Sequence, residues 1–94
     1  MITAFLSPSK KAYKKWTIVI YDKKIHFGDS RYKDYTQHKN KERKRRYILR
    51  HAKREDWKDP LSAGFWSRWL LWNKPTIRES KASLQSKFKI KVKQ

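Results

Sequence analysis

The sequence predicts a single small domain of the α+β class, and three observations lead to that class. Alternating strand-forming residues at 16–21 and a second run at 25–27 predict a β-hairpin. Capping and proline signals then predict about three helices, at 36–54, 61–72 and 76–83. A chain of 94 residues holds one modest core. Because a lone hairpin is marginal in water, we expect it to pack on the helices.

The hairpin prediction depends on one strong strand. Trp16, Ile18 and Ile20 alternate with other strand formers, so both faces of this strand should be partly covered. We expect the turn at residues 22–24 and the end of the second strand at Gly28.

Local capping residues indicate where each helix should begin. Thr36 should cap the first helix. Asp59 before Pro60 is a capping side chain followed by proline at the first helical position. Thr76 with Glu79 forms the capping-box pattern of the third, short helix.

The second helix carries an aromatic run that should supply the core. Phe65, Trp69 and Trp72 stand at i, i+4 and i+7, so they share one helical face. Trp66 and Leu71 lie off that stripe, and we take them as candidates for an exposed patch that contacts a protein partner. Stacking of tryptophan on unpaired bases is the alternative use of this run.

Basic extensions are expected on both sides of the compact part. We assign residues 1–15 to a basic N-terminal arm, 16–84 to the compact α+β domain and 85–94 to a Lys-rich C-terminal tail. Within the tail, apolar residues alternate with lysines from Phe88 to Val92. The tail is therefore either an edge strand or an arm that orders on a partner.

Charge is the strongest functional signal in the sequence. The chain has 26 Lys and Arg against eight Asp and Glu, a net charge of +18. Like charges repel one another in a compact state, so this excess is more than a small domain needs for its own stability. It should attract nucleic acid, anionic lipid or acidic protein surfaces, with strong salt dependence, and charge alone does not choose among the three.

The helix at 36–54 carries the densest positive charge. Its like-charged i, i+4 pairs, such as Lys41 and Arg45, each cost about 0.2–0.5 kcal/mol, so folding does not call for them. The alternative is a solvated face kept basic for solubility. The predicted polyanion-binding residues are Lys39, Lys41, Arg43, Lys44, Arg45, Arg46, Arg50, Lys53 and Arg54 on this helix, with Lys10, Lys11, Lys14, Lys15, Lys87, Lys89, Lys91 and Lys93 in the two arms.

Composition narrows the classes of function. The chain has no cysteine, which excludes disulfides, thiolate catalysis and Cys-ligated zinc and fits an intracellular setting. Its longest apolar stretch is far shorter than the roughly 18 residues that a membrane span needs, so we expect a soluble or peripheral protein. The aromatic run lacks a Lys-rich polar face, so a membrane ranks last among the partners.

We expect a binding protein, not an enzyme, with no cofactor, no metal and no small-molecule substrate. The three histidines lack a close metal-ligand spacing, and two glycines cannot form a phosphate loop. Asp22, Asp29 and Asp34 could gather a hard cation, so a small basic nuclease is the remaining enzymatic alternative. Turn and cap roles already account for Asp22 and Asp29.

Two strings resemble a known family: HFGDSRYKDYTQHKNKERKRRYILRH at 26–51 and DPLSAGFWSRWLLWNKPTIRES at 59–80. They are similar to a small uncharacterised domain encoded by large nucleocytoplasmic DNA viruses of algae and protists. The resemblance covers roughly residues 16–80, and GFWSRWLLWNKP is its most specific part. The family has no assigned catalytic residues, so the resemblance implies no site residues. It implies only a setting, namely that the protein is a viral product packaged in the particle.

Two hypotheses use the same charges in that setting. In the first, the protein is a minor structural component of the capsid that contacts acidic partners or viral DNA. In the second, it packages the genome by binding DNA without sequence preference. We favour the first, with the virion as its location and otherwise the cytoplasm or nucleus of the host.

Overall fold

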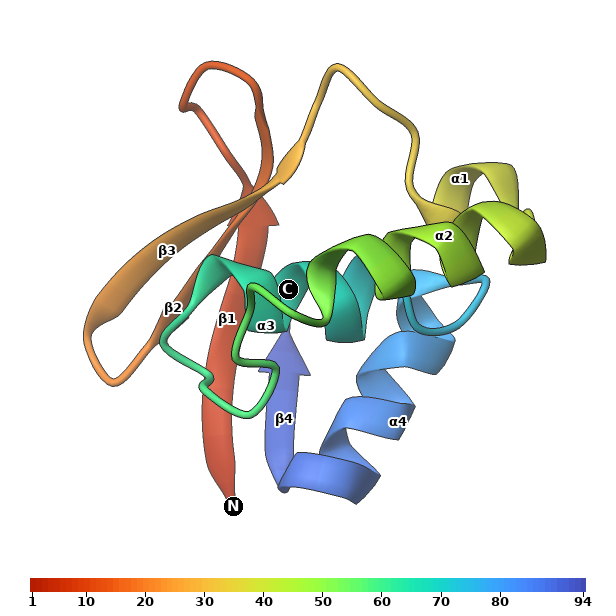
Figure 1. The fold of residues 1–94 in the computed structure, drawn as a ribbon. Helices are drawn as coiled ribbons and strands as arrows, with labels where there is room; N and C mark the ends of the chain where they lie inside the picture. Colours follow the sequence, from red (N-terminus) through yellow and green to blue (C-terminus); the bar gives the residue numbers. More distant parts are fainter.

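The computed structural model describes residues 1–94 as a four-stranded sheet with helices packed against one of its faces (Figure 1). The predicted single α+β domain is confirmed. The elements in chain order are β1 (Ile2–Pro8), β2 (Lys14–Ile20), β3 (Lys23–Asp29), α1 (Tyr35–His38), α2 (Lys41–His51), α3 (Ala63–Trp66), the π-helical turn η1 (Ser67–Leu71), α4 (Ile77–Phe88) and β4 (Ile90–Lys93).

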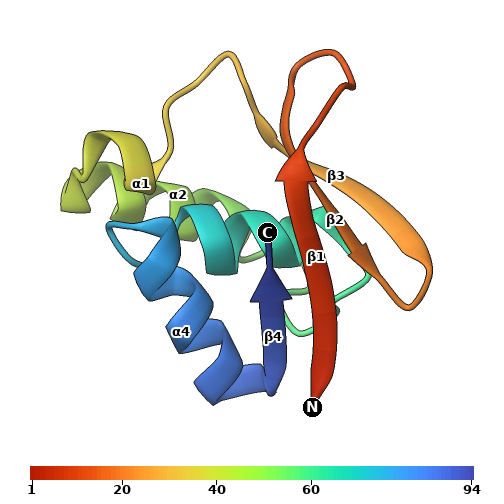
Figure 2. The same cartoon turned by 180° about the vertical axis from the view of Figure 1, so that it is seen from behind.

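The sheet has the order β3-β2-β1-β4 and mixes both pairing directions. β1 and β3 run antiparallel to β2, whereas β4 runs parallel to β1. The register places Leu6 beside Ile18 in the centre of the sheet and Ile2 beside Ile90 at its edge. Apolar residues of neighbouring strands therefore share the face that packs on the helices. Seen from behind, β1 and β4 lie in front, with no helix over them (Figure 2).

The chain ends that were expected to be basic arms form strands instead. β1 lies within residues 1–15 and β4 within residues 85–94, and the two strands are parallel neighbours. Ala4, Leu6 and Ile90 are 0%, 3% and 2% exposed, so the ends of the chain help to build the core. Alternation of apolar residues outweighs the nearby lysines, which alternate away from the core. The edge-strand alternative for the tail is confirmed.

The predicted hairpin is confirmed, with longer strands and a tighter turn. The two turn residues are Tyr21 and Asp22, with φ of 51° and 61°, as short hairpin turns with matching twist require. The turn therefore lies one residue before the expected position at 22–24. Gly28 has φ of +80°, and a Cβ there would lie 2.7 Å from Cδ1 of Leu71, so both backbone and packing favour glycine.

The long helix expected at 36–54 is two helices, α1 and α2. Asp34, not Thr36, caps α1, and its capping box is completed by Gln37. Lys39 has φ of 56° and ends α1. The side chain of Asn40 then accepts hydrogen bonds from two backbone amides of α2, so a second N-cap replaces the expected continuous helix.

The aromatic segment begins later than expected and contains a π-helical turn. Ser62 caps α3 by accepting a hydrogen bond from the amide of Phe65, whereas Asp59 and Pro60 precede the helix. In η1, the amide of Trp72 donates to the carbonyl of Ser67 over 3.0 Å, an i to i+5 bond. Such a turn inserts one residue and changes which side chains face the core.

The expectation of an exposed patch at Trp66 and Leu71 is wrong. Both side chains are buried, at 0% and 1% exposure, so they form no exposed patch for a protein partner. Phe65 is buried as predicted, whereas Trp69 and Trp72 are only partly buried and pack around the core. The core consists of Ala4, Leu6, Ile18, Ile20, Phe27, Phe65, Trp66, Leu70, Leu71, Leu84 and Ile90.

The last helix, α4, starts where the sequence predicted and ends later. The hydroxyl of Thr76 accepts a hydrogen bond from the amide of Glu79, which confirms the cap. The helix continues past residue 83 because Leu84 is buried in the core, and Lys89, with φ of 59°, ends it. None of the helices combines the length and the apolar character that crossing a membrane requires.

Candidate functional site

Very little of the positive charge is neutralised within the molecule. Only three of the 26 Lys and Arg side chains pair with a carboxylate. The pairs are Lys15–Asp34, Arg31–Asp29 and Arg45–Glu42. A fourth ion pair joins His51 to Glu55. The positive field of the protein is therefore available to a partner.

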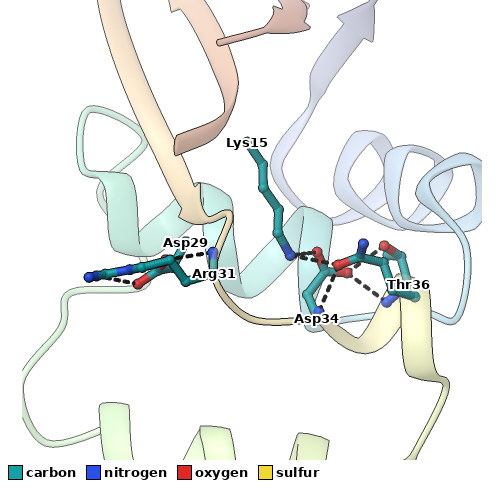
Figure 3. Close-up of polar contacts among 6 residues, drawn as sticks. Lys15, Asp29, Arg31, Asp34 and Thr36 are labelled. Atoms are coloured by element: carbon teal, nitrogen blue, oxygen red, sulfur yellow. Dashed lines mark hydrogen bonds and ion pairs between the residues drawn. The ribbon is translucent and has the colours of Figure 1, made fainter. Parts of the chain in front are cut away.

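A buried ion pair fixes one end of the loop between β3 and α1 (Figure 3). Lys15 Nζ on β2 donates to Asp34 Oδ2 over 2.7 Å and to Gln37 Oε1 over 2.6 Å. Asp34 Oδ1 also accepts from the amide of Thr36 over 2.9 Å. One carboxylate thus joins the sheet to the start of α1.

The other end of this loop is held by Asp29 and Arg31. The guanidinium of Arg31 donates to both carboxylate oxygens of Asp29, over 3.0 and 2.9 Å, and these bonds lower the pKa of Asp29 to about 2. Arg31 also lies 4.8 Å above the ring of Tyr13. With both ends held, the exposed residues Tyr32 and Lys33 stand between two fixed points.

Helix α2 is held opposite this loop mainly by ring stacking. Tyr47, the one buried residue of α2, stacks on Trp72 with ring centroids 4.4 Å apart and planes at 3°. Burial raises the pKa of its hydroxyl well above the ordinary value. Lys44 Nζ donates to the carbonyl of Asn73 over 2.6 Å, and burial lowers its pKa. These contacts turn the arginine-bearing flank of α2 toward the loop.

Between α2 and the loop lies a small hollow, which we call the cationic hollow. Its volume is about 220 Å³, and it is lined by Tyr32, Lys33, Arg43, Arg46, Arg50 and Trp72. The three arginines have the i, i+3, i+7 spacing that places side chains on one helical flank. No carboxylate lines the hollow. Four cations therefore converge there beside two aromatic rings.

A larger cleft of about 480 Å³ adjoins the cationic hollow. The two spaces share Tyr32, Lys33, Arg50 and Trp72. The cleft extends from these residues to Gly28 on β3 and to Leu71 at the end of η1, among other lining residues.

The acidic side chains that line the cleft are all engaged inside the protein. Asp29 pairs with Arg31, and Asp34 pairs with Lys15. Glu55 accepts from His51 Nδ1 over 2.9 Å and from Trp57 Nε1 over 2.8 Å. Their charge is therefore offset locally, and the cleft presents Lys14, Lys33 and Arg50 as cations without a carboxylate partner.

The structure uses several of the predicted polyanion-binding residues to hold the fold. Lys15 and Arg45 are in the ion pairs above, and Lys44 binds a backbone carbonyl. Lys39 Nζ donates to the carbonyls of Thr36 and Pro75. Lys87 Nζ lies 4.2 Å from the ring centre of Trp69. These side chains are less free to bind a partner than the sequence indicated.

The remaining predicted cations fall into three groups. Arg43, Arg46 and Arg50 line the cationic hollow and Lys14 lines the cleft. The second group is exposed to solvent. It consists of Lys41 on α2, Lys53 and Arg54 just after α2, and Lys10 and Lys11 before β2. Lys89, Lys91 and Lys93 belong to the junction of α4 with β4 and to β4 itself; that junction lies at the far end of the molecule from the loop (Figure 1).

Sequence reasoning did not find Tyr32, Lys33, Tyr47 and Trp72 as site residues. The net charge of residues 28–38 is zero, so the sequence showed no sign of a local positive charge. In the structure Asp29 and Asp34 pair with Arg31 and Lys15, and Lys33 has no carboxylate partner. The interleaved basic and aromatic residues at 31–33 were the available signal.

The three aspartates considered for a cation site are not brought together. Asp22 lies in the turn between β2 and β3, Asp29 ends β3 and Asp34 caps α1. No group of three or more metal-ligating side chains converges in the structure. The three aspartates therefore do not form the cation site considered from the sequence.

Comparison with known proteins matches a family model over residues 4–51. The matched region runs from β1 to the end of α2 and contains the loop and the arginine flank of the cationic hollow. It includes the string at 26–51, whereas the string at 59–80 lies outside it. No curated protein and no solved structure matches the chain. Since the model covers just over half of the chain, the protein belongs to the family of unknown function DUF5754.

Proposed function

We propose that this protein binds nucleic acid through the cationic hollow and the exposed flank of α2, without preference for sequence. The observation that carries the proposal is the convergence of Lys33, Arg43, Arg46 and Arg50 on one hollow that no carboxylate lines. Arginine can fork onto phosphate oxygens, and lysine adds a point charge. Contacts of this kind bind the backbone and do not read bases.

The shape of this surface favours a nucleic-acid strand over an acidic protein surface. Seven helical steps separate Arg43 from Arg50, which is about 10 Å along α2. Three nucleotides of a strand rise by about the same length. Exposed Lys53 and Arg54 follow at the end of the helix. The aromatic rings of Tyr32 and Trp72 lie beside the cations, where bases would follow the phosphates.

The test compares two variants that lose the same charge. The first is Arg43→Ala with Arg46→Ala and Arg50→Ala, and the matched control is Lys23→Ala with Lys24→Ala and Arg78→Ala, all exposed residues. Binding to two duplexes of unrelated sequence is measured by fluorescence anisotropy at low salt, after circular dichroism confirms folding. We expect the α2 variant to bind both duplexes about tenfold more weakly or worse, and the control to change little.

Two results would overturn the proposal. If both variants weaken binding equally, the field of the whole protein is responsible and the hollow is not a site. If the unaltered protein ignores nucleic acid at low salt but binds an acidic protein tightly, the partner is a protein.

We further propose that the setting is the particle of a large DNA virus, where the protein is a minor structural component. What supports this is the resemblance of residues 16–80, together with a charge excess that a packaged polyanion would offset. Stepwise dissection of purified particles tests it. Release together with the genome agrees with the nucleic-acid proposal, and release with the shell indicates an acidic capsid partner. Absence from particles rejects the setting.

A further inference from the structure

Phosphate binding by the cationic hollow does not make use of the cleft beside it. We propose that it holds one unpaired nucleotide, so that the protein prefers single-stranded nucleic acid to duplex. This inference rests on the proposed function and deepens it by naming the form of the nucleic acid. The phosphates would lie on the arginine flank of α2, and the base would enter the cleft between α2 and the loop.

The cationic hollow and the cleft are continuous. Tyr32, Lys33, Arg50 and Trp72 line both the cationic hollow and the cleft. A ligand with a charged end and a flat ring can therefore place its charge among the cations while its ring occupies the adjoining space. A nucleotide has this chemistry, and stacking on aromatic side chains tolerates any base.

Two aromatic side chains of the cleft, Trp72 and Tyr32, are placed where they could stack on a base. Trp72 is fixed in orientation because it stacks on Tyr47 at 4.4 Å, and it still lines the cleft. Tyr32 is 65% exposed at the rim, although its neighbours Arg31 and Asp34 are fixed by ion pairs. A large exposed aromatic residue on a loop held at both ends is suited to cover a base, because little further ordering is needed.

The size and the charge of the cleft also suit a nucleotide. A volume of about 480 Å³ lies within the range of sites for small ligands, about 300–1,000 Å³. The acidic side chains of the cleft already have partners, so they repel the phosphates bound beside the cleft less. A paired base cannot enter such a cleft without being unstacked and flipped, which favours a strand that is already unpaired.

The experiment measures affinity for an oligothymidylate of about 15 nucleotides and for a duplex of the same length at low salt. We expect the single strand to bind about tenfold more tightly. Tyr32→Ala should remove most of this preference, because it should weaken binding of the single strand more than binding of the duplex, whereas Tyr32→Phe should keep the preference. Tyr21→Ala is the matched control, since Tyr21 is 58% exposed in the distant β2–β3 turn.

Photocrosslinking with the same strand carrying 5-iodouracil gives an independent readout. We expect the crosslinked peptide to contain Tyr32 or Trp72. Thymidine monophosphate is the third arm: if it binds as tightly as the strand, the site is for a free nucleotide and the inference is wrong.

The two proposals fail in different ways. If neither single strand nor duplex binds, the proposed function itself fails. A second set of results would overturn only the inference about the cleft. In it, single strand and duplex bind equally tightly, Tyr32→Ala does not change either affinity, and the crosslinks fall on other residues.

Discussion

At the scale of single residues, two aspartates five positions apart have very different roles. Asp34 is 3% exposed, pairs with Lys15 and caps α1, so its charge is satisfied entirely within the protein. Asp29 lies at the surface and pairs with the exposed Arg31. Removing one partner of a buried pair leaves an uncompensated charge, whereas an exposed pair contributes little.

This contrast gives a prediction for the stability of the fold. We expect Asp34→Ala to lower the free energy of unfolding by about 3 kcal/mol, because Lys15 is left buried without its partner and α1 loses its cap. Asp29→Ala is the control, with a smaller loss that shrinks further at high salt. Urea denaturation measures both. Equal losses for the two variants would show that the Lys15–Asp34 pair does not hold the loop.

At the scale of elements, those set by local sequence signals were predicted better than those set by long-range strand pairing. Alternation gave the β2–β3 hairpin, and Thr76 gave the start of α4, because both signals act between near neighbours. The pairing of β1 with β4 joins the two ends of the chain and leaves no local trace except weak alternation. Lysines in both end segments made them look like arms.

The break between α1 and α2 and the π-helical turn were also missed for physical reasons. Asn40 can cap a helix or continue one, and only the packing of Tyr47 on Trp72 decides where α2 lies. The wide turn in η1 puts residues five apart on one face, so Leu71 is buried together with Trp66, which a regular period of 3.6 residues cannot foresee. The arginines of α2 were therefore predictable, whereas the aromatic half of the site was not.

The junction of α1 and α2 should make stability depend on pH through His38. Its Nδ1 accepts a hydrogen bond from the amide of Asn40 over 2.9 Å, and its Nε2 is buried without a partner. Burial, together with nearby Arg43, lowers the pKa of His38 below its ordinary value of 6.5. The folded state thus prefers neutral His38, and its contribution is present above pH 6.5 and lost as the pH falls below it.

The measurement is urea denaturation at about pH 7 and about pH 5. We expect the free energy of unfolding to fall with acidification in the unaltered protein and to fall less in His38→Gln, which cannot take up the proton. All other titratable groups are common to both proteins, so the difference isolates His38. The same pH dependence in both proteins would show that His38 does not couple the junction to protonation.

At the scale of the whole molecule, the fold and the charge serve different purposes. The core is apolar and closes the sheet against the helices, while only three of 26 Lys and Arg side chains find a carboxylate. A net charge of +18 opposes compactness, and a bound polyanion would offset that repulsion. Four cations without a carboxylate partner converge where α2 faces the loop.

The most direct test of this account is the salt dependence of DNA binding. A logarithmic plot of the association constant against salt concentration should be linear, with a slope of about −0.9 per neutralised phosphate. We expect the variant lacking Arg43, Arg46 and Arg50 to lose about 2–3 units of slope, and the control lacking Lys23, Lys24 and Arg78 to keep the slope of the unaltered protein. An unchanged slope in the α2 variant would contradict the account, because those arginines would then displace no counterions from phosphate.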